Sequence, residues 1–119
     1  QRKKINIIQI GANDGLIGDP IYEFVMSAKH FTNILLIEPQ EFLEPYLRRN
    51  YENHPNYQIS KHIIGPPGTL KLFSVNPEYW SRLKVPYGKN LPEYRAPSGI
   101  ASTDRRHVQR WLDLYLKDF

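Results

Sequence analysis

Residues 5–15 read INIIQIGANDG, and this stretch constrains the fold more than any other part of the chain. Four isoleucines within six residues, interrupted by one asparagine and one glutamine, are typical of a strand buried on both faces, as central strands of parallel sheets are. The run stops at a polar loop bracketed by Gly11 and Gly15, and glycine tolerates the backbone angles of tight turns. The pattern predicts a buried parallel strand over residues 5–10 that turns sharply at its carboxyl end.

Hydrophobic spacing then predicts alternating helices and strands. Within 18–30, Asp19 suits the cap of a helix and Pro20 its first position. A second buried strand follows at 33–40 and a second helix at 41–54, whose first turn Pro45 delays or kinks. The order strand, helix, strand, helix, strand is that of an α/β fold with right-handed crossovers.

The second half of the chain is less regular. Residues 57–64 and 69–75 read as an antiparallel pair of strands around Gly-Pro-Pro-Gly at 65–68. Residues 76–99 hold four prolines and read as a long irregular loop. A closing helix follows residues 102–104, which offer N-caps. Its apolar stripe consists of Val108, Trp111, Leu112, Tyr115, Leu116 and Phe119.

The composition narrows the function classes. The chain has 119 residues, which suits one domain, and no cysteine, which excludes disulfides and thiolate chemistry. No apolar run approaches the roughly 20 residues needed to span a bilayer, so we expect no membrane association. The absence of cysteine is compatible with a reducing cytosol, and we expect a cytoplasmic location. Because the chain begins with Gln1 rather than Met, we expect it to be a piece of a longer protein.

The net charge of +4 raises the possibility of a nucleic-acid binder. Its basic residues, however, stand as doublets and one triplet scattered between elements, which is typical of a solvated surface, so nucleic acid is not the expected partner. That alternative would use four aromatic residues of the irregular segment as stacking platforms. They are Tyr79, Trp80, Tyr87 and Tyr94.

The glycine-bracketed loop does not match the common phosphate-binding motifs. A dinucleotide fingerprint would need glycine where this chain has Asn13 and Leu16, and no GK[ST] is present. Asp14 would also repel an anion. Glu38, 23 residues beyond Gly15, ends the next strand, where a carboxylate can accept hydrogen bonds from ribose hydroxyls. The two features suit S-adenosylmethionine, which has a ribose and a sulfonium cation but no phosphate; the alternative is a plain tight turn and an exposed glutamate.

Several motifs together resemble the FkbM-type S-adenosylmethionine-dependent methyltransferases: IQIGANDG, GDPIYEFV, LLIEPQ, LRRNY, GTLKLFSVNPE and GIASTDRRHV. The resemblance runs from Ile5 to about Val108 and implies a Rossmann-like class I methyltransferase fold. It also implies that the residues at the ends of the first two strands contact the cofactor, while His62 to Ile64 lie by the adenine. The implied cofactor-binding residues are Gly11, Ala12, Asn13, Asp14, Gly15 and Glu38, with Pro39 and Gln40 shaping the turn.

The chain also departs from that family. Pro45 interrupts a helix that usually runs unbroken, and the fourth strand with its acidic D-x-E-G-like segment is missing. Residues 1–119 would then form a single partial methyltransferase domain holding the first half of the sheet. Strand 5–10 would lie at an edge, and we expect the closing helix or a second copy of the chain, in a homodimer, to cover it.

The resemblance implies methyl transfer to oxygen of a glycan or small-molecule acceptor. Candidates for a general base are Asp104, His107 and Asp19, although each also suits a structural role, and the catalytic residues stay unknown. No cluster of histidines and acids predicts a metal site. The alternative function is a catalytically incomplete module that binds the cofactor or associates with itself.

Overall fold

The structure, a computed structural model, describes residues 3–83 and 90–116. The chain divides into two compact units, residues 1–66 and 67–119. The assignment of residues 1–119 to a single domain stays a prediction.

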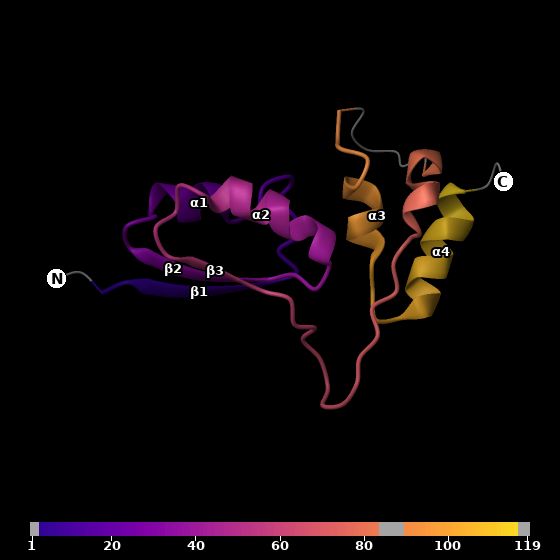
Figure 1. The fold of residues 1–119 in the computed structure, drawn as a ribbon, viewed down its shortest axis with the longest axis horizontal. Helices are drawn as coiled ribbons and strands as arrows, with labels where there is room; N and C mark the ends of the chain where they lie inside the picture. The colour runs from indigo at the N-terminus through magenta and orange to yellow at the C-terminus, as the bar shows by residue number, and fades with distance from the viewer. Residues whose placement is uncertain (1–2, 84–89, 117–119) are drawn as a thin grey trace. The chain divides into compact units, whose positions relative to one another are not determined.

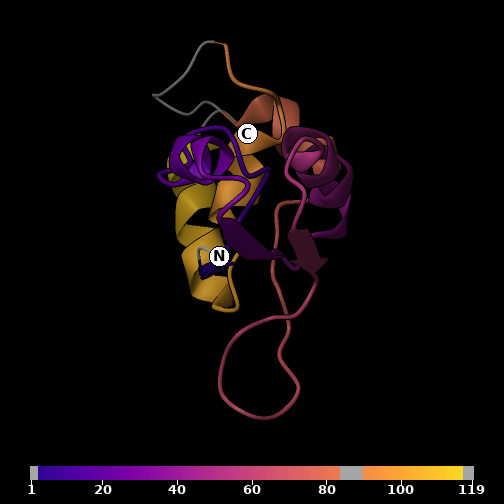
Figure 2. The ribbon, with the colours of Figure 1, turned by 90° about the vertical axis from the view of Figure 1, so that its left-hand side faces the viewer.

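The first unit is an α/β arrangement with a parallel sheet in the order β1-β2-β3. Figures 1 and 2 show both of its α-helices on the same side of the sheet, in which β1 and β3 are the two edge strands. The predicted α/β class with parallel strands is confirmed. Its elements are β1 (Ile5–Ile10), α1 (Tyr22–Ser27), β2 (Thr32–Ile37), a 3-10 turn η1 (Glu41–Leu43), α2 (Glu44–Tyr51) and β3 (Tyr57–Ser60).

Proline explains why the last two strands end earlier than predicted. The ladder between β2 and β3 runs to the partners Ile37 and Ser60, and the Glu38 amide still donates to the Ser60 carbonyl at 2.9 Å. Pro39 comes next and has no N–H to continue the ladder. Residues 38–40 and 61–64, predicted as strand, therefore lie outside the sheet.

Asp19 and Pro45 lie at the starts of the two helices of this unit. The Asp19 carboxylate accepts hydrogen bonds from the amides of Ile21 and Tyr22, both at 2.9 Å. The helix itself begins at Tyr22 with Ile21 at the N-cap position, so the predicted placement of Pro20 as the first helical residue is wrong. The regular part of α1 is also shorter than the predicted segment 18–30. Pro45 lies in the first turn of α2, and the 3-10 turn η1 precedes it, so the predicted late start of this helix is confirmed.

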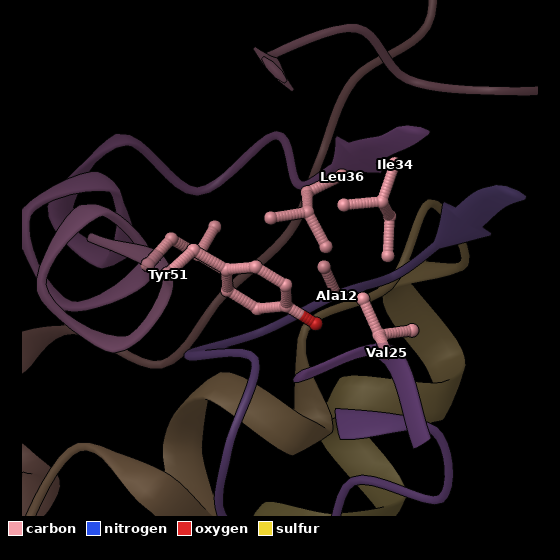
Figure 3. Close-up of a cluster of buried hydrophobic side chains, with 6 residues drawn as sticks. Ala12, Val25, Ile34, Leu36 and Tyr51 are labelled. Carbon is pink, nitrogen blue, oxygen red and sulfur yellow. The ribbon is translucent and has the colours of Figure 1, made fainter. Parts of the chain in front are cut away.

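The core of the first unit forms where the helices cover the sheet. Figure 3 shows the Tyr51 ring reaching from α2 toward Ala12 and Val25, with Leu36 and Ile34 of β2 beside them. Each of these side chains is at most 2% exposed. The residue that follows Gly11 in the loop is therefore part of the core, which anchors the start of the loop.

The predicted antiparallel pair of strands at 57–64 and 69–75 is wrong. Among the described residues of 69–75, only Phe73 makes a bridge, and its partner is Ser102. Tight hairpins need positive φ in the central turn residues, whereas Pro66 and Pro67 fix φ near −65° and donate no hydrogen bond. The two prolines therefore do not suit a tight two-residue hairpin turn beside β3.

The second unit is helical, and the expectation that prolines prevent regular structure in 76–99 is wrong. The unit contains a 3-10 helix η2 (Pro77–Arg82), α3 (Arg95–Ile100) and α4 (Arg105–Tyr115). Pro77 and Pro97 both lie in a first helical turn, where the missing N–H would have no partner within the helix. Proline begins η2 and is accommodated within the first turn of α3, so it breaks neither helix.

The predicted closing helix is confirmed as α4, which Asp104 caps by accepting from the Arg106 amide at 3.0 Å. Buried Val108 joins Val75 and Ile100 in a small core, against which Trp111 and Leu112 pack. The stripe position Phe119 lies outside the described residues. None of the helices formed by the described residues is long and apolar enough to cross a membrane.

His54 follows α2 and is held in its neutral form by the hydrogen bonds around it. Thr32 Oγ1 donates to the Ala28 carbonyl at 3.0 Å and contacts His54 Nε2 at 2.9 Å, so Nε2 carries the proton. His54 Nδ1 accepts from the Asn56 amide at 3.0 Å. Burial lowers the pKa of His54, and the positive charges of Lys29, Lys4 and His30 lower it further.

We predict that acid destabilises the first unit through His54. Because the pKa in the folded state lies below the ordinary value of about 6.5, the unfolded state binds the proton more readily. The free energy of unfolding should therefore fall as the pH drops below about 6.5 and level off once His54 is protonated in the folded state. Urea unfolding between roughly pH 8 and pH 5 measures this dependence.

The control is the exposed His62. His54→Gln should lower the free energy of unfolding by about 1–3 kcal/mol, since the Asn56 amide loses its acceptor, and should flatten the pH dependence. His62→Gln should change neither quantity. An unchanged pH dependence in His54→Gln would show that another group causes it.

Candidate functional site

The two segments predicted to form a site lie side by side at the carboxyl ends of β1 and β2. The amides of Gly11 and Ala12 both donate to the Ile37 carbonyl, at 2.9 and 3.0 Å. This pairing places loop 11–15 directly beside Glu38, Pro39 and Gln40. The sequence-predicted cofactor-binding residues are thus gathered at one edge of the sheet, where open α/β sheets bind ligands.

Glu38 connects the two segments. Its side chain is buried, with 5% of the residue exposed, and its Oε1 accepts a hydrogen bond from the Asn13 amide at 2.8 Å. Its Oε2 accepts from the Gln40 amide at 3.0 Å and from Gln40 Nε2 at 3.3 Å. The exposed strand-terminal glutamate of the alternative interpretation is therefore wrong: this carboxylate holds the loop and the β2 turn together.

Asp14 shapes the loop from within. The residue is 1% exposed, and its Oδ1 accepts hydrogen bonds from the amides of Leu16 at 2.9 Å and Ile17 at 3.0 Å. Asn13 lies in the left-handed region with φ of 53°, and its Oδ1 accepts from the Asp14 amide at 2.9 Å. Side chains of the loop thus satisfy the loop's own amides, as asparagine and aspartate commonly do.

Gly15 has a packing role that the sequence did not indicate. Its φ is +78°, and a Cβ added there would lie 2.8 Å from Leu47 Cδ2 and 2.9 Å from Tyr51 Cε2. The absent side chain therefore lets the loop lie against α2. Gly11 also has a positive φ, of +76°, but a Cβ there would meet nothing within 4 Å.

Asn50 is a site residue that sequence reasoning missed. Its side-chain Nδ2 donates to the Asp14 backbone carbonyl at 2.7 Å, and its backbone carbonyl accepts from the Tyr22 hydroxyl at 3.0 Å. Asn50 follows Leu47 by three positions on α2, so both lie on the face that contacts the loop. A polar residue within the apolar stripe of this helix was the available signal.

Two further polar groups lie buried in the first unit. Gln9 Nε2 donates to Asp19 Oδ2 at 2.6 Å, while Gln9 Oε1 and the Tyr51 hydroxyl have no hydrogen-bond partner within the described part of the chain. Burial raises the pKa of Tyr51, and the negative charge of Asp19 adds to that effect. Tyr51 is therefore a neutral phenol at physiological pH.

The candidate general bases have structural roles. Asp19 binds the amides of Ile21 and Tyr22 before and at the start of α1, and it also binds Gln9. Asp104 caps α4, and its hydrogen bond from the Arg106 amide lowers the pKa of its carboxyl, while the His107 ring lies 6.3 Å from the Trp111 ring. Within residues 3–83 and 90–116, no group of three or more histidines and acids could hold a metal ion.

The remaining predicted contacts are distributed between the two units. Exposed His62, whose Nδ1 lies 2.6 Å from the Ser60 hydroxyl, follows β3 at the carboxyl edge, where the adenine contact was expected. The proposed stacking platforms contribute to packing instead: Tyr94 is 8% exposed, and Tyr79 and Trp80 pack against the Val75 core. Tyr87 lies outside the described residues.

Comparison with known proteins gave no relative: no protein-family model matches the chain, and neither a curated protein nor a solved structure matches it.

We predict that Gly15 is far less replaceable than Gly11. Both substitutions to alanine strain a left-handed backbone, at about 1–2 kcal/mol. Gly15→Ala also forces a methyl group into Leu47 and Tyr51, which adds about 1–3 kcal/mol of overpacking. Urea unfolding should therefore show Gly15→Ala losing about 2–5 kcal/mol and Gly11→Ala only the strain. Equal losses would show that the loop is not pressed against α2.

Proposed function

We propose that this chain is the N-terminal portion of an S-adenosylmethionine-dependent methyltransferase of the FkbM type, with a class I methyltransferase fold. The observation that carries the proposal is the 2.8 Å hydrogen bond between the Asn13 amide and Glu38. It brings the glycine-bracketed loop and the strand-terminal acid together at the carboxyl edge of a parallel sheet. The proposal keeps the cytoplasmic location expected from a chain without cysteine.

The electrostatics favour a cofactor without phosphate. Two acidic residues, Asp14 and Glu38, lie at this edge, and their negative charge opposes the approach of a pyrophosphate. S-adenosylmethionine is a cation at its sulfur, and its ribose offers two hydroxyl donors. The donor and acceptor types of the site therefore fit this cofactor better than a dinucleotide.

The bonds from the described residues leave the Glu38 carboxylate with acceptor capacity for one further donor. An ionised carboxylate has about four acceptor positions, and three are used by Asn13 and Gln40. The bond from Gln40 Nε2 is the longest, at 3.3 Å. A ribose hydroxyl would take the remaining position or replace the Gln40 side chain, while the Asn13 amide keeps Glu38 in place.

The residues of this chain would act by binding and orientation. When bound, S-adenosylmethionine supplies an electrophilic methyl group, and its transfer depends mainly on aligning the acceptor with that group. Loop 11–15 and Glu38 would fix the cofactor, and a hydroxyl of a glycan or small metabolite would be the acceptor. The general base stays unassigned, because Asp19, Asp104 and His107 have the structural contacts described above.

A second candidate function is that of a self-associating module. It is favoured by β1, which pairs only with β2 among the described residues and leaves Ile5, Ile8 and Ile10 more than half exposed. Such a module would need no complete cofactor pocket.

We predict that S-adenosylmethionine and S-adenosylhomocysteine bind this chain saturably in calorimetric titrations. Glu38→Ala should weaken binding by roughly 10- to 100-fold, because hydrogen bonds to a charged group contribute about 1.5–3 kcal/mol. The matched control is Glu41→Ala, which removes an exposed carboxylate three residues away and should leave the affinity unchanged.

Loss of the fold must be separated from loss of the contact, since Glu38 also braces the loop. Circular dichroism and urea unfolding of Glu38→Ala identify a variant that has unfolded. Absence of binding by the wild-type chain at millimolar cofactor would contradict the methyltransferase proposal.

A further inference from the structure

The outer edge of β1 presents unpaired backbone groups at regular intervals. The amides of Ile5 and Gly11 donate to Phe31 and Ile37, so odd-numbered residues of β1 direct their backbone groups toward β2. Alternation along a strand then directs the N–H and C=O groups of residues 6, 8 and 10 outward. Among the described residues, no strand pairs with this edge.

The side chains of these outward residues carry no charge. Asn6 is bonded to Asn33, whose Nδ2 donates to Asn6 Oδ1 at 2.9 Å, while Ile8 and Ile10 are 65% and 64% exposed. Natural sheets usually protect edge strands with lysine, proline or a bulge, and β1 has none of these between Ile5 and Ile10. The outer edge of β1 is therefore suited to pairing with a further strand.

We propose that β1 pairs antiparallel with β1 of a second copy of the chain, with Ile8 on the two-fold axis. The inference rests on the second candidate function, self-association, and specifies its geometry. The three-stranded sheets of two copies would join into one sheet of six strands.

Symmetry restricts the register of this pairing. A two-fold axis perpendicular to the sheet keeps the helices of both copies on the same side of the joined sheet. Each even-numbered residue of β1 must then lie opposite an even-numbered residue of the partner strand, and each odd-numbered residue opposite an odd-numbered one. An axis at Ile8 places Ile8 opposite itself and Asn6 opposite Ile10 of the partner subunit. An axis at Ile7 would instead place Ile10 opposite Lys4 of the partner subunit, which buries less apolar surface. An axis at Gln9 would pair only residues 8–10, because β1 ends at Ile10.

Charge also favours the antiparallel arrangement. Lys3 and Lys4 precede β1, whereas Asp14 and Glu38 lie beyond its carboxyl end. Antiparallel pairing around Ile8 places Lys4 of the partner subunit opposite Ala12, beside the acidic loop, whereas parallel pairing would place lysines together. A second copy thus complements the charge along this edge.

A single cysteine at position 8 tests the register, because the chain has no cysteine of its own. Cα atoms of a hydrogen-bonded antiparallel pair lie about 5.5 Å apart, within the range of about 4.4–6.8 Å that a disulfide spans. Under mild oxidation, Ile8→Cys should form a disulfide-linked dimer at least about tenfold faster than the controls, because the two-fold axis holds its thiols together. Sedimentation of the wild-type chain should show a dimer.

The controls are Ile10→Cys and Gln58→Cys, both exposed. Cysteine at 10 would face Asn6 of the partner subunit, and cysteine at 58 lies on β3, away from the interface, so both should crosslink only at the collision rate. A wild-type monomer would overturn self-association itself. A dimer in which position 58 crosslinks as fast as position 8 would keep self-association and overturn the β1 pairing.

Discussion

The buried carboxylate of Glu38 is the constraint on which the edge of the sheet depends. A charge removed from water must be compensated by donors, and this carboxylate takes its donors from the loop after β1 and from the turn after β2. Two segments separated by a helix in the sequence are thereby held in one geometry. The position of Asn13, and with it the path of loop 11–15, follows from that requirement.

Helix α2 also holds loop 11–15 in place, through contacts with Gly15 and Asp14. Gly15 leaves space for Leu47 and Tyr51, and Asn50 binds the Asp14 carbonyl. The start of this helix is in turn set by Pro45 and the 3-10 turn before it. A shift of the helix along its axis would remove all three contacts, so the loop geometry depends on where α2 begins.

The sequence predicted those parts of the fold that depend on local pattern. The cap at Asp104 and the late start of α2 follow from neighbouring residues, and the structure has both. The isoleucine run forms a parallel strand as predicted, but its predicted burial is wrong: β1 lies at an edge of the three-stranded sheet, and none of its residues is buried. The predictions that are wrong concern the effect of proline on helices and the contacts of side chains with residues distant in the sequence. Pro77 and Pro97 were read as breakers although a first helical turn accepts them. At the site, the residues that meet were predicted, but Asn50 was missed, because its partner is a backbone carbonyl 36 residues away.

Loop 11–15 is built almost entirely from bonds that exist before anything binds to it. The amides of Asn13, Asp14, Leu16 and Ile17 donate to side chains of the chain itself. Ordering a flexible segment costs about 1–2 kcal/mol of conformational entropy per residue. In this chain the loop is already ordered when the protein folds, so binding does not have to order it. A molecule that docks at this edge would therefore retain more of its contact free energy as affinity than it would on a loop that must first be ordered.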